Sequence, residues 1–306
     1  MSMRVLTVCA LLASASAFAG DPQLLRFLMP EAKVVSGVDI ERVKSSPFGQ
    51  FLLSQIPQSD PELEKFIAAT GFDPRRDLLE VVMATPGDPA HKTGLAVVRG
   101  NFDADRFLAL LQGRVEVYQG VRIASAGHAL AFIDNTTVLA GDLESVRAAI
   151  ERRNGANPLD PALAAKVAEI STSQDAWGVS ILPLSTLAAS VPDRNAGGAL
   201  QSDLLKAIQQ TSGGVRFGEN VDLSAEAVTR SEKDATALAD VVRFLVSLAQ
   251  LNAPKGPGAE VVAWLQRLSI ATQSNTVKLS LSIPEAELEK LILSAKGRSA
   301  RRTAAR

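Results

Sequence analysis

Cysteine and histidine are nearly missing from this chain, which has one cysteine and two histidines among 306 residues. Cys9 lies in an N-terminal segment that we expect to be removed, so the mature chain has no thiol. This excludes disulfides, a thiolate nucleophile and cysteine-ligated metals. His91 and His128 fall in predicted turns, and neither has an acidic residue or a second histidine at ligand spacing. We therefore predict no metal site.

Motifs of catalysis and cofactor binding are also missing. The chain has no G-x-S-x-G elbow, no H-E-x-x-H motif, no P-loop and no glycine-rich dinucleotide fingerprint. The glycine-rich stretch TSGGVRFGEN leads into a strand pattern, which favours a hairpin turn over a phosphate-binding loop. The sequence therefore predicts no catalytic residue and no cofactor, and it favours a protein that is not an enzyme.

Aromatic residues make up 5% of the chain, whereas hydrophobic residues make up 46%. This balance favours a folded protein with an aliphatic core. The chain lacks the basic face and stacking aromatics that nucleic-acid binding needs. Beyond the N-terminus, the best candidate for a membrane span, residues 235–253, contains Asp240 and Arg243. We therefore predict a soluble protein whose mature chain has no transmembrane helix.

The N-terminus has the anatomy of an export signal. Arg4 is followed by an uncharged apolar run that ends in small residues at Ala19. This pattern predicts a signal peptide over residues 1–19, cleaved between Ala19 and Gly20, and a periplasmic or extracellular protein. Lipidation at Cys9 is an alternative, but a bulky valine precedes this cysteine where a small residue is wanted.

The order of predicted elements divides the mature chain into two parts. We predict an α+β fold of two similar modules, each a mainly antiparallel sheet covered by helices, over residues 20–153 and 175–293. Residues 154–174 are expected to form a linker with a short helix, because Asn-Gly, Asn-Pro and Asp-Pro steps mark turns there. Residues 294–306 are basic and have little to bury, which predicts a flexible tail.

A strand, a polar turn and a helix recur in both modules. At one constant offset, five residues of the first module match five of the second: Ala96, Val97, Arg99, Asp103 and Ala104 match Ala227, Val228, Arg230, Asp234 and Ala235. Because the order of elements repeats as well, we interpret this as a duplication. Asp103 and Asp234 are the expected helix caps, which favours a folding role for these residues over two ligand sites.

The helix predicted to follow Asp234 carries an apolar stripe: Leu238, Val241, Val242, Leu245 and Leu248. We expect this stripe to cover the sheet of the second module. Phe244 of the same helix is predicted to lie in the core. Its replacement by alanine should then lower the stability of that module by about 3–5 kcal/mol.

Charge separates the tail from the rest of the mature chain. The whole chain has 32 basic and 33 acidic residues. When Arg4 and the five basic residues of the tail are set aside, 26 basic residues remain against the 33 acidic ones. The tail residues are candidate contacts to an anionic surface: Lys296, Arg298, Arg301, Arg302 and Arg306. A solvated terminus, or a tail that folds over its own acidic body, are the alternatives.

One polar cluster and one asparagine are explained by turn structure without a catalytic or modification role. The stretch DPRRD, residues 73–77, places two carboxylates beside Arg75 and Arg76. Such carboxylates can serve acid/base catalysis, but a capped and solvated turn is favoured. Asn135 satisfies a glycosylation pattern, although a turn between strands accounts for it equally well.

Several stretches together resemble a broad class of exported bacterial proteins of unknown function. These are MPEAKVVSGVDI, GFDPRRDLLEVVMA, GLAVVRGNFDADRFLALL, VYQGVRIAS and LAFIDNTTVLAGDLESVRAAI. They share a proline step into a strand, an FDP step before a strand, and a Tyr-x-Gly turn, here Tyr118 and Gly120. The resemblance covers much of the mature chain and implies an exported, duplicated α+β protein. It implies no active site.

We therefore expect a non-catalytic protein of the bacterial envelope that binds a partner protein or an apolar, lipid-like ligand. A groove between a sheet and its helices, or the gap between the modules, is the expected place. A hydrolase whose carboxylates converge only in the fold is one alternative, and a purely structural envelope protein is another.

Overall fold

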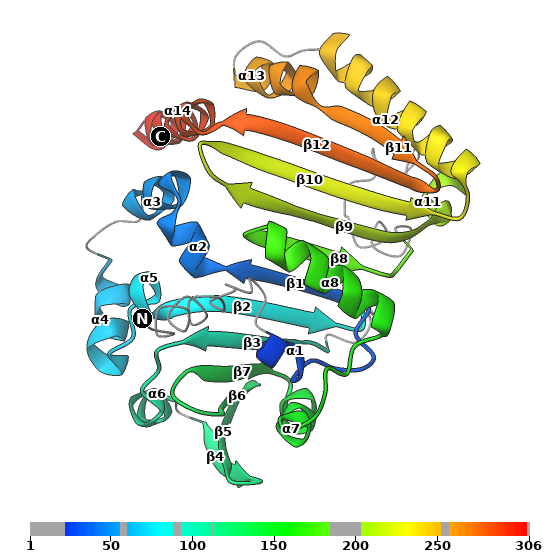
Figure 1. The fold of residues 1–306 in the computed structure, drawn as a ribbon. Coiled ribbons are helices and arrows are strands. Elements are labelled where there is room, and N and C mark those ends of the chain that lie inside the picture. Colours follow the sequence, from blue (N-terminus) through cyan, green and yellow to red (C-terminus); the bar gives the residue numbers. More distant parts are fainter. Residues whose placement is uncertain are drawn as a thin grey trace, which may run out of the picture.

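The computed structural model describes residues 22–55, 60–87, 93–111, 113–183, 203–251 and 257–304. Its strands form one twelve-stranded sheet in the order β11-β12-β10-β9-β8-β1-β2-β3-β7-β6-β5-β4 (Figure 1). Every neighbouring pair is antiparallel. The strands are β1 Val34–Asp39, β2 Leu78–Thr85, β3 Leu95–Gly100, β4 Arg114–Tyr118, β5 Val121–Ala126, β6 His128–Phe132, β7 Thr137–Gly141, β8 Ala176–Ser180, β9 Ile208–Phe217, β10 Asn220–Thr229, β11 Ser269–Gln273 and β12 Thr276–Pro284.

Helices lie between these strands and confirm a mixed helix and strand protein built on a large antiparallel sheet. They are α1 Pro22–Leu25, α2 Ile40–Ser45, α3 Pro47–Ser54, α4 Pro61–Thr70, α5 Pro74–Asp77, α6 Ala104–Leu110, α7 Leu143–Arg152, α8 Pro161–Ser173, α11 Asp203–Ala207, α12 Glu232–Leu251, α13 Pro257–Trp264 and α14 Glu285–Ala304. A short 3-10 turn, η1 Leu265–Arg267, follows α13. Within the described ranges, no helix combines the length and the apolar character that a membrane crossing requires.

The two predicted modules contribute to the same sheet. Strand β1 pairs with β8 at its centre, with Val35 opposite Val179. Gly37 lies opposite Trp177, and a Cβ atom on this glycine would come within 2.5 Å of the indole Cζ2. The close approach of ring and backbone requires glycine here. The strand ladder therefore runs without interruption from one predicted module into the other.

Helix α8 occupies most of the stretch predicted to be a linker, residues 154–174. Asp160 caps it and Pro161 is its first residue, as the Asp-Pro step indicates. Its apolar face is buried, however: Leu163 and Val167 are inaccessible and belong to the same core cluster as the strands of the first half. A helix that buries its face in this way is part of the folded core, which corrects the linker prediction.

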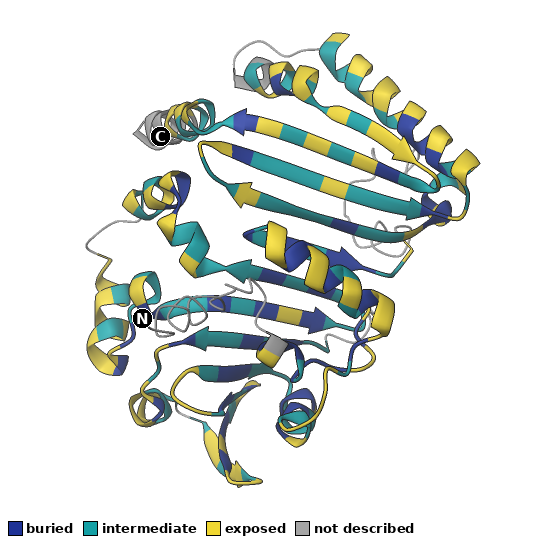
Figure 2. Ribbon diagram, viewed as in Figure 1, coloured by how far each residue is buried: buried dark blue, intermediate teal, exposed yellow. Residues whose placement is uncertain are grey.

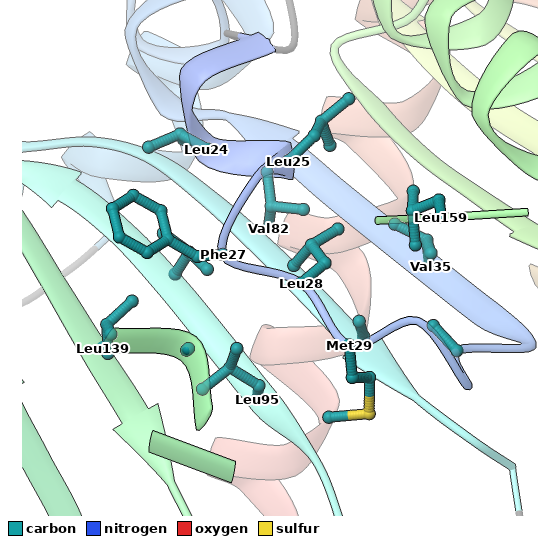
Figure 3. Close-up of a cluster of buried hydrophobic side chains, with 14 of the residues drawn as sticks. Leu24, Leu25, Phe27, Leu28, Met29, Val35, Val82, Leu95, Leu139 and Leu159 are labelled. Carbon is teal, nitrogen blue, oxygen red and sulfur yellow. The ribbon is translucent and has the colours of Figure 1, made fainter. Parts of the chain in front are cut away.

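The largest core cluster includes apolar residues of α1 and of the segment that follows it. Leu24, Leu25, Phe27, Leu28 and Met29 are each at most 5% exposed and lie across β2, β3 and β7, beside Val82, Leu95 and Leu139 (Figure 3). Sequence reasoning missed this segment, because it is too short to show a helical or strand period. The residues just after the expected cleavage point therefore complete the core.

The caps of the two matched helices differ. Asp103 caps α6 as predicted, because its Oδ1 accepts the backbone N–H of Arg106 at 3.2 Å. Helix α12 begins earlier than predicted, and Ser231 is its cap: the Ser231 Oγ accepts the N–H of Asp234 at 3.2 Å and donates to its carboxylate at 2.9 Å. Asp234 is thus the third residue of the helix and its carboxylate holds the cap hydroxyl, so it is not itself the cap, which corrects its predicted role.

The apolar stripe of α12 is only partly buried. Leu238 is buried and Val242 packs against it, whereas Val241, Leu245 and Leu248 are 43%, 50% and 44% exposed (Figure 2). Phe244 is 65% exposed, because the sheet covers the side of the helix that carries Ala235, Leu238 and Ala239. The prediction that Phe244→Ala destabilises the core is therefore wrong. We now expect a change in unfolding free energy within about 0.5 kcal/mol.

The C-terminal stretch is also different from its prediction. Helix α14 runs from Glu285 to Ala304, so residues 294–304 continue a helix where a flexible tail was expected. Alanine, lysine and arginine are good helix formers, which explains how the helix extends beyond its last large apolar residues.

Candidate binding surfaces

The structure describes only some of the residues that the sequence singled out. Ala19, Gly20, His91 and Arg306 lie outside the described residues. His128 begins β6 and is exposed, and Asn135 is exposed in the turn between β6 and β7. Four of the five basic tail residues share one helix, α14: Lys296, Arg298, Arg301 and Arg302. Across the described ranges, no three metal-ligating side chains gather into a possible ion site.

The matched arginines both take part in ion pairs close to their own strands. Arg99 on β3 pairs with Glu80 on β2 at 2.8 Å, and Glu80 is nearly inaccessible. Arg230, which follows β10, pairs with Asp234 at 3.6 Å. These contacts use the arginines within the fold, so they favour the folding role over a pair of ligand sites.

One polar cavity of about 420 Å³ lies between the ends of α4 and α5 and the start of α6. It brings together the carboxylates of Asp77 and Asp103, which a hydrolase with converging carboxylates would require. The other lining residues are Thr70, Gly71, Arg76, Asn101, Phe102, Arg106, Asn135 and Thr136. The decisive property is therefore how each carboxylate is bound.

Both carboxylates already have partners that hold them in structural roles. Asp77 accepts two hydrogen bonds from the Arg76 guanidinium, at 2.8 and 2.7 Å, and the backbone N–H of Asp73 at 2.8 Å. The hydrogen bonds from Arg76 lower the pKa of Asp77, so its carboxyl is ionised at neutral pH and cannot donate a proton. Asp103 is the cap of α6. This geometry resembles a capped turn and gives the hydrolase alternative little support.

The DPRRD turn should make stability depend on pH below about 4, the ordinary range of an aspartate pKa. Hydrogen bonds from Arg75 and Arg76 lower the pKa values of Asp73 and Asp77 in the folded chain. A lowered folded-state pKa adds stability above the unfolded-state pKa, and this stability is lost as the pH falls through the folded value. Asp77→Asn should therefore flatten the acid limb of urea-unfolding free energies measured against pH. Equal acid limbs in the variant and the wild type would contradict this account.

A second surface is an open groove on one face of the sheet, beside α8. Two adjoining cavities of about 400 and 430 Å³ form it, and both include Ser173, Gln174, Ser224, Ser269 and Ser280. Three of these serines form one row across β10, β12 and β11, because Ser280 pairs with both Ser224 and Ser269. The groove thus has a floor of small hydroxyl side chains.

Ion pairs stand at the two ends of this groove. Lys166 of α8 contacts Glu226 of β10 at 2.9 Å, and Arg216 contacts Asp222 at 2.8 Å at the other end. An apolar ligand would have to displace water from these hydroxyl and charged groups without replacing their hydrogen bonds. Apolar side chains share the lining with these polar groups: Ile170, Leu223, Leu279 and Leu281.

The third surface is the outer face of α12, defined here as Ala237, Val241, Phe244, Leu245, Leu248 and Leu251, all exposed. Leu251 is 84% exposed, and Val261 on the following helix α13 is 43% exposed. On α12 itself, Asp240 and Arg243 pair with each other at 2.8 Å. A contiguous run of large exposed apolar side chains is the usual mark of an interaction surface. Sequence reasoning had assigned four of these six residues to the buried side of the helix: Val241, Phe244, Leu245 and Leu248.

Comparison with known proteins gives little further guidance. No protein-family model matches the chain, and no curated protein matches it. The chain is similar to two crystal structures of TP0453, a Treponema protein. One has 9% identity and a TM-score of 0.47, covering 88% of this chain and 96% of that chain; the other has 10%, 0.49, 88% and 97%. A likeness this distant carries no argument about function.

Proposed function

We propose that this chain is an exported protein of the bacterial envelope that has no catalytic role and binds a partner protein through the outer face of α12. The observation that carries the proposal is the exposure of Phe244 and Leu251, 65% and 84%, on a helix whose opposite side is packed on the sheet. Burying such side chains contributes about 1.5–3 kcal/mol each, which a monomer leaves unused.

The spacing of the outer face favours a helix as the partner. Ala237, Val241, Phe244, Leu248 and Leu251 follow one another at intervals of four, three, four and three residues. This is the spacing of an a/d seam, which packs against a second helix whose apolar residues follow the same repeat. From Ala237 to Leu251 the helix rises through 14 residues, which gives a seam about 21 Å long at 1.5 Å per residue.

The envelope location rests on the N-terminal sequence. The apolar run after Arg4 and the small residues up to Ala19 support a signal peptide, and these residues lie outside the described ranges. Five residues near the start of the described chain are core residues, and a mature chain that starts at Gly20 keeps them all: Leu24, Leu25, Phe27, Leu28 and Met29.

We also propose that the chain arose by duplication. From the centre outward, one half of the sheet runs β1-β2-β3-β7-β6 and the other β8-β9-β10-β12-β11. In both halves, a helix follows the third strand along the chain and another follows the strand that pairs with it. This order supports a repeat related by an approximate two-fold axis between β1 and β8. The β4–β5 hairpin is then an addition to the first half.

The partner proposal is tested by a photo-crosslinking residue in place of Phe244, introduced in the bacterium that makes the protein. We expect an adduct with one protein, crosslinked within a helix that has apolar residues at three- and four-residue intervals. The matched control is the same residue in place of Lys290 on α14, which is 77% exposed and should give no such adduct. Adducts with lipid alone, or equal adducts from both positions, would overturn the proposal.

A further inference from the structure

The edge strand β4 exposes apolar side chains and unpaired backbone groups. Among the described strands, β4 pairs with β5 alone and ends the sheet opposite β11. Val115 and Val117 are 48% and 69% exposed. Proteins usually protect such an edge, because its free N–H and C=O groups can pair with another strand. The exposed valines of β4 leave this edge open to such pairing.

The turn after β4 determines which backbone groups point outward. Gln119 and Gly120 have φ values of 47° and 80°, which makes the β4–β5 connection a two-residue turn of the I′ kind. Its flanking residues, Tyr118 and Val121, then form a hydrogen-bonded pair, and hydrogen-bonded pairs alternate along an antiparallel ladder. The backbone groups of Val115 and Val117 therefore point away from β5, into solvent.

Strand β4 carries one basic and one acidic side chain on the same face, so two antiparallel copies of it can pair opposite charges. Arg114 and Glu116 lie on one face of the strand, two residues apart. Within the described part of the chain, Arg114 makes no ion pair, whereas Glu116 accepts both hydrogen bonds of Arg147 on Oε1, at 3.0 and 2.5 Å. Among the described residues, no hydrogen bond reaches the Oε2 of Glu116, so this oxygen can accept one from an arginine on a neighbouring strand.

We propose that β4 pairs antiparallel with β4 of a second copy of this chain, about a two-fold axis at Val115. The two Val115 residues then exchange their outward N–H···O=C bonds, and Val117 lies opposite Gly113 of the partner subunit. On the other face, Arg114 lies opposite Glu116 of the partner subunit, twice per dimer. Opposite charges in cross-strand pairs stabilise a ladder. The two sheets become one continuous sheet.

The register shifted by one residue, and the other edge of the sheet, lack this pairing of opposite charges. A two-fold axis at Glu116 would place the two Glu116 carboxylates directly opposite each other, which is unfavourable. The edge strand β11 exposes Ser269, Ala271, Thr272 and Gln273, which carry no charge to pair. Because β4 has only five residues, the expected dimer is reversible and depends on protein concentration.

The test uses the mature chain, which contains no cysteine of its own. Val115→Cys places two thiols at the proposed axis, where Cα atoms about 5.5 Å apart suit a disulfide. Under mild oxidation we expect this variant to form a covalent dimer, whereas the matched control Val117→Cys should link far more slowly. Faster linking through position 117, or equal rates, would overturn the register.

A second variant tests the pairing itself. Val115→Pro removes an outward N–H that the β4–β5 ladder does not use, and proline is tolerated at such edge positions. We expect analytical ultracentrifugation to show twice the monomer mass for the wild type at high concentration and the monomer mass for the variant. Their melting temperatures, measured at low concentration, should be equal. A wild-type chain that stays monomeric at every concentration would overturn the proposal.

Discussion

Replacing Phe27 by alanine is expected to lower the free energy of unfolding by about 3–5 kcal/mol, the largest effect of any single substitution considered for this protein. Phe27 is 2% exposed and lies in the main core cluster with Leu28 and Met29 (Figure 3). Truncating its ring removes buried apolar area and leaves a cavity that neighbours on three strands cannot fill.

Denaturant unfolding of the mature chain, followed by circular dichroism, measures this difference. The matched control is Phe244→Ala, the same truncation at a side chain that is 65% exposed, where a change within about 0.5 kcal/mol is expected. A Phe27→Ala variant as stable as this control would show that the N-terminal segment does not pack on the sheet in solution.

Replacing Asp175 by alanine is expected to lower the free energy of unfolding by about 2–4 kcal/mol. This carboxylate is 2% exposed and lies where the two halves of the sheet meet. It accepts the backbone N–H of Phe217 at 2.7 Å and pairs with Arg42 at 2.6 Å. Alanine would leave the partly buried N–H of Phe217 without its acceptor and remove the partner of the partly buried Arg42 guanidinium.

The asparagine variant separates the two contributions of Asp175. Asp175→Asn retains an oxygen that can accept the N–H of Phe217, but it loses the charge that pairs with Arg42. We expect it to lose about half as much stability as the alanine variant. Thermal unfolding of both variants checks this order. If the alanine variant had the same melting temperature as the wild type, the contacts of Asp175 would not stabilise the junction between the two halves of the sheet.

Local signals in the sequence predicted local structure well. Asp60 and Pro61 begin α4 and Gly71 ends it in a left-handed conformation, as their types indicate. Asp103 caps α6 for the same reason. Each of these assignments depends on hydrogen bonds within a few residues, so neighbouring residues contain all the information required.

Assignments that depend on distant residues were wrong. The apolar stripe of α12 could have faced the sheet along its whole width, and the sequence does not tell which side the sheet covers. Phe244 and Leu238 are equally apolar, yet one is 65% and the other 9% exposed. The same holds for α8, whose buried face depends on strands from both halves of the chain.

The candidate surfaces also differ in how far the sequence could predict them. The exposed seam of α12 has a sequence signal, its three- and four-residue spacing, but only the fold shows that this side is uncovered. The serine-lined groove and the free edge of β4 have no sequence signal, because both arise from the order of strands in the sheet. Strand order is decided by packing between residues far apart in the chain.

The sequence by itself determined the α+β composition, the caps of several helices and the presence of a single cysteine, Cys9. Residue types and short spacings are sufficient for these. Only the tertiary structure decided that both halves share one sheet, that Leu24 to Met29 complete the core, and which apolar side chains remain outside. Burial depends on which surfaces meet, and that is a property of the whole packed chain.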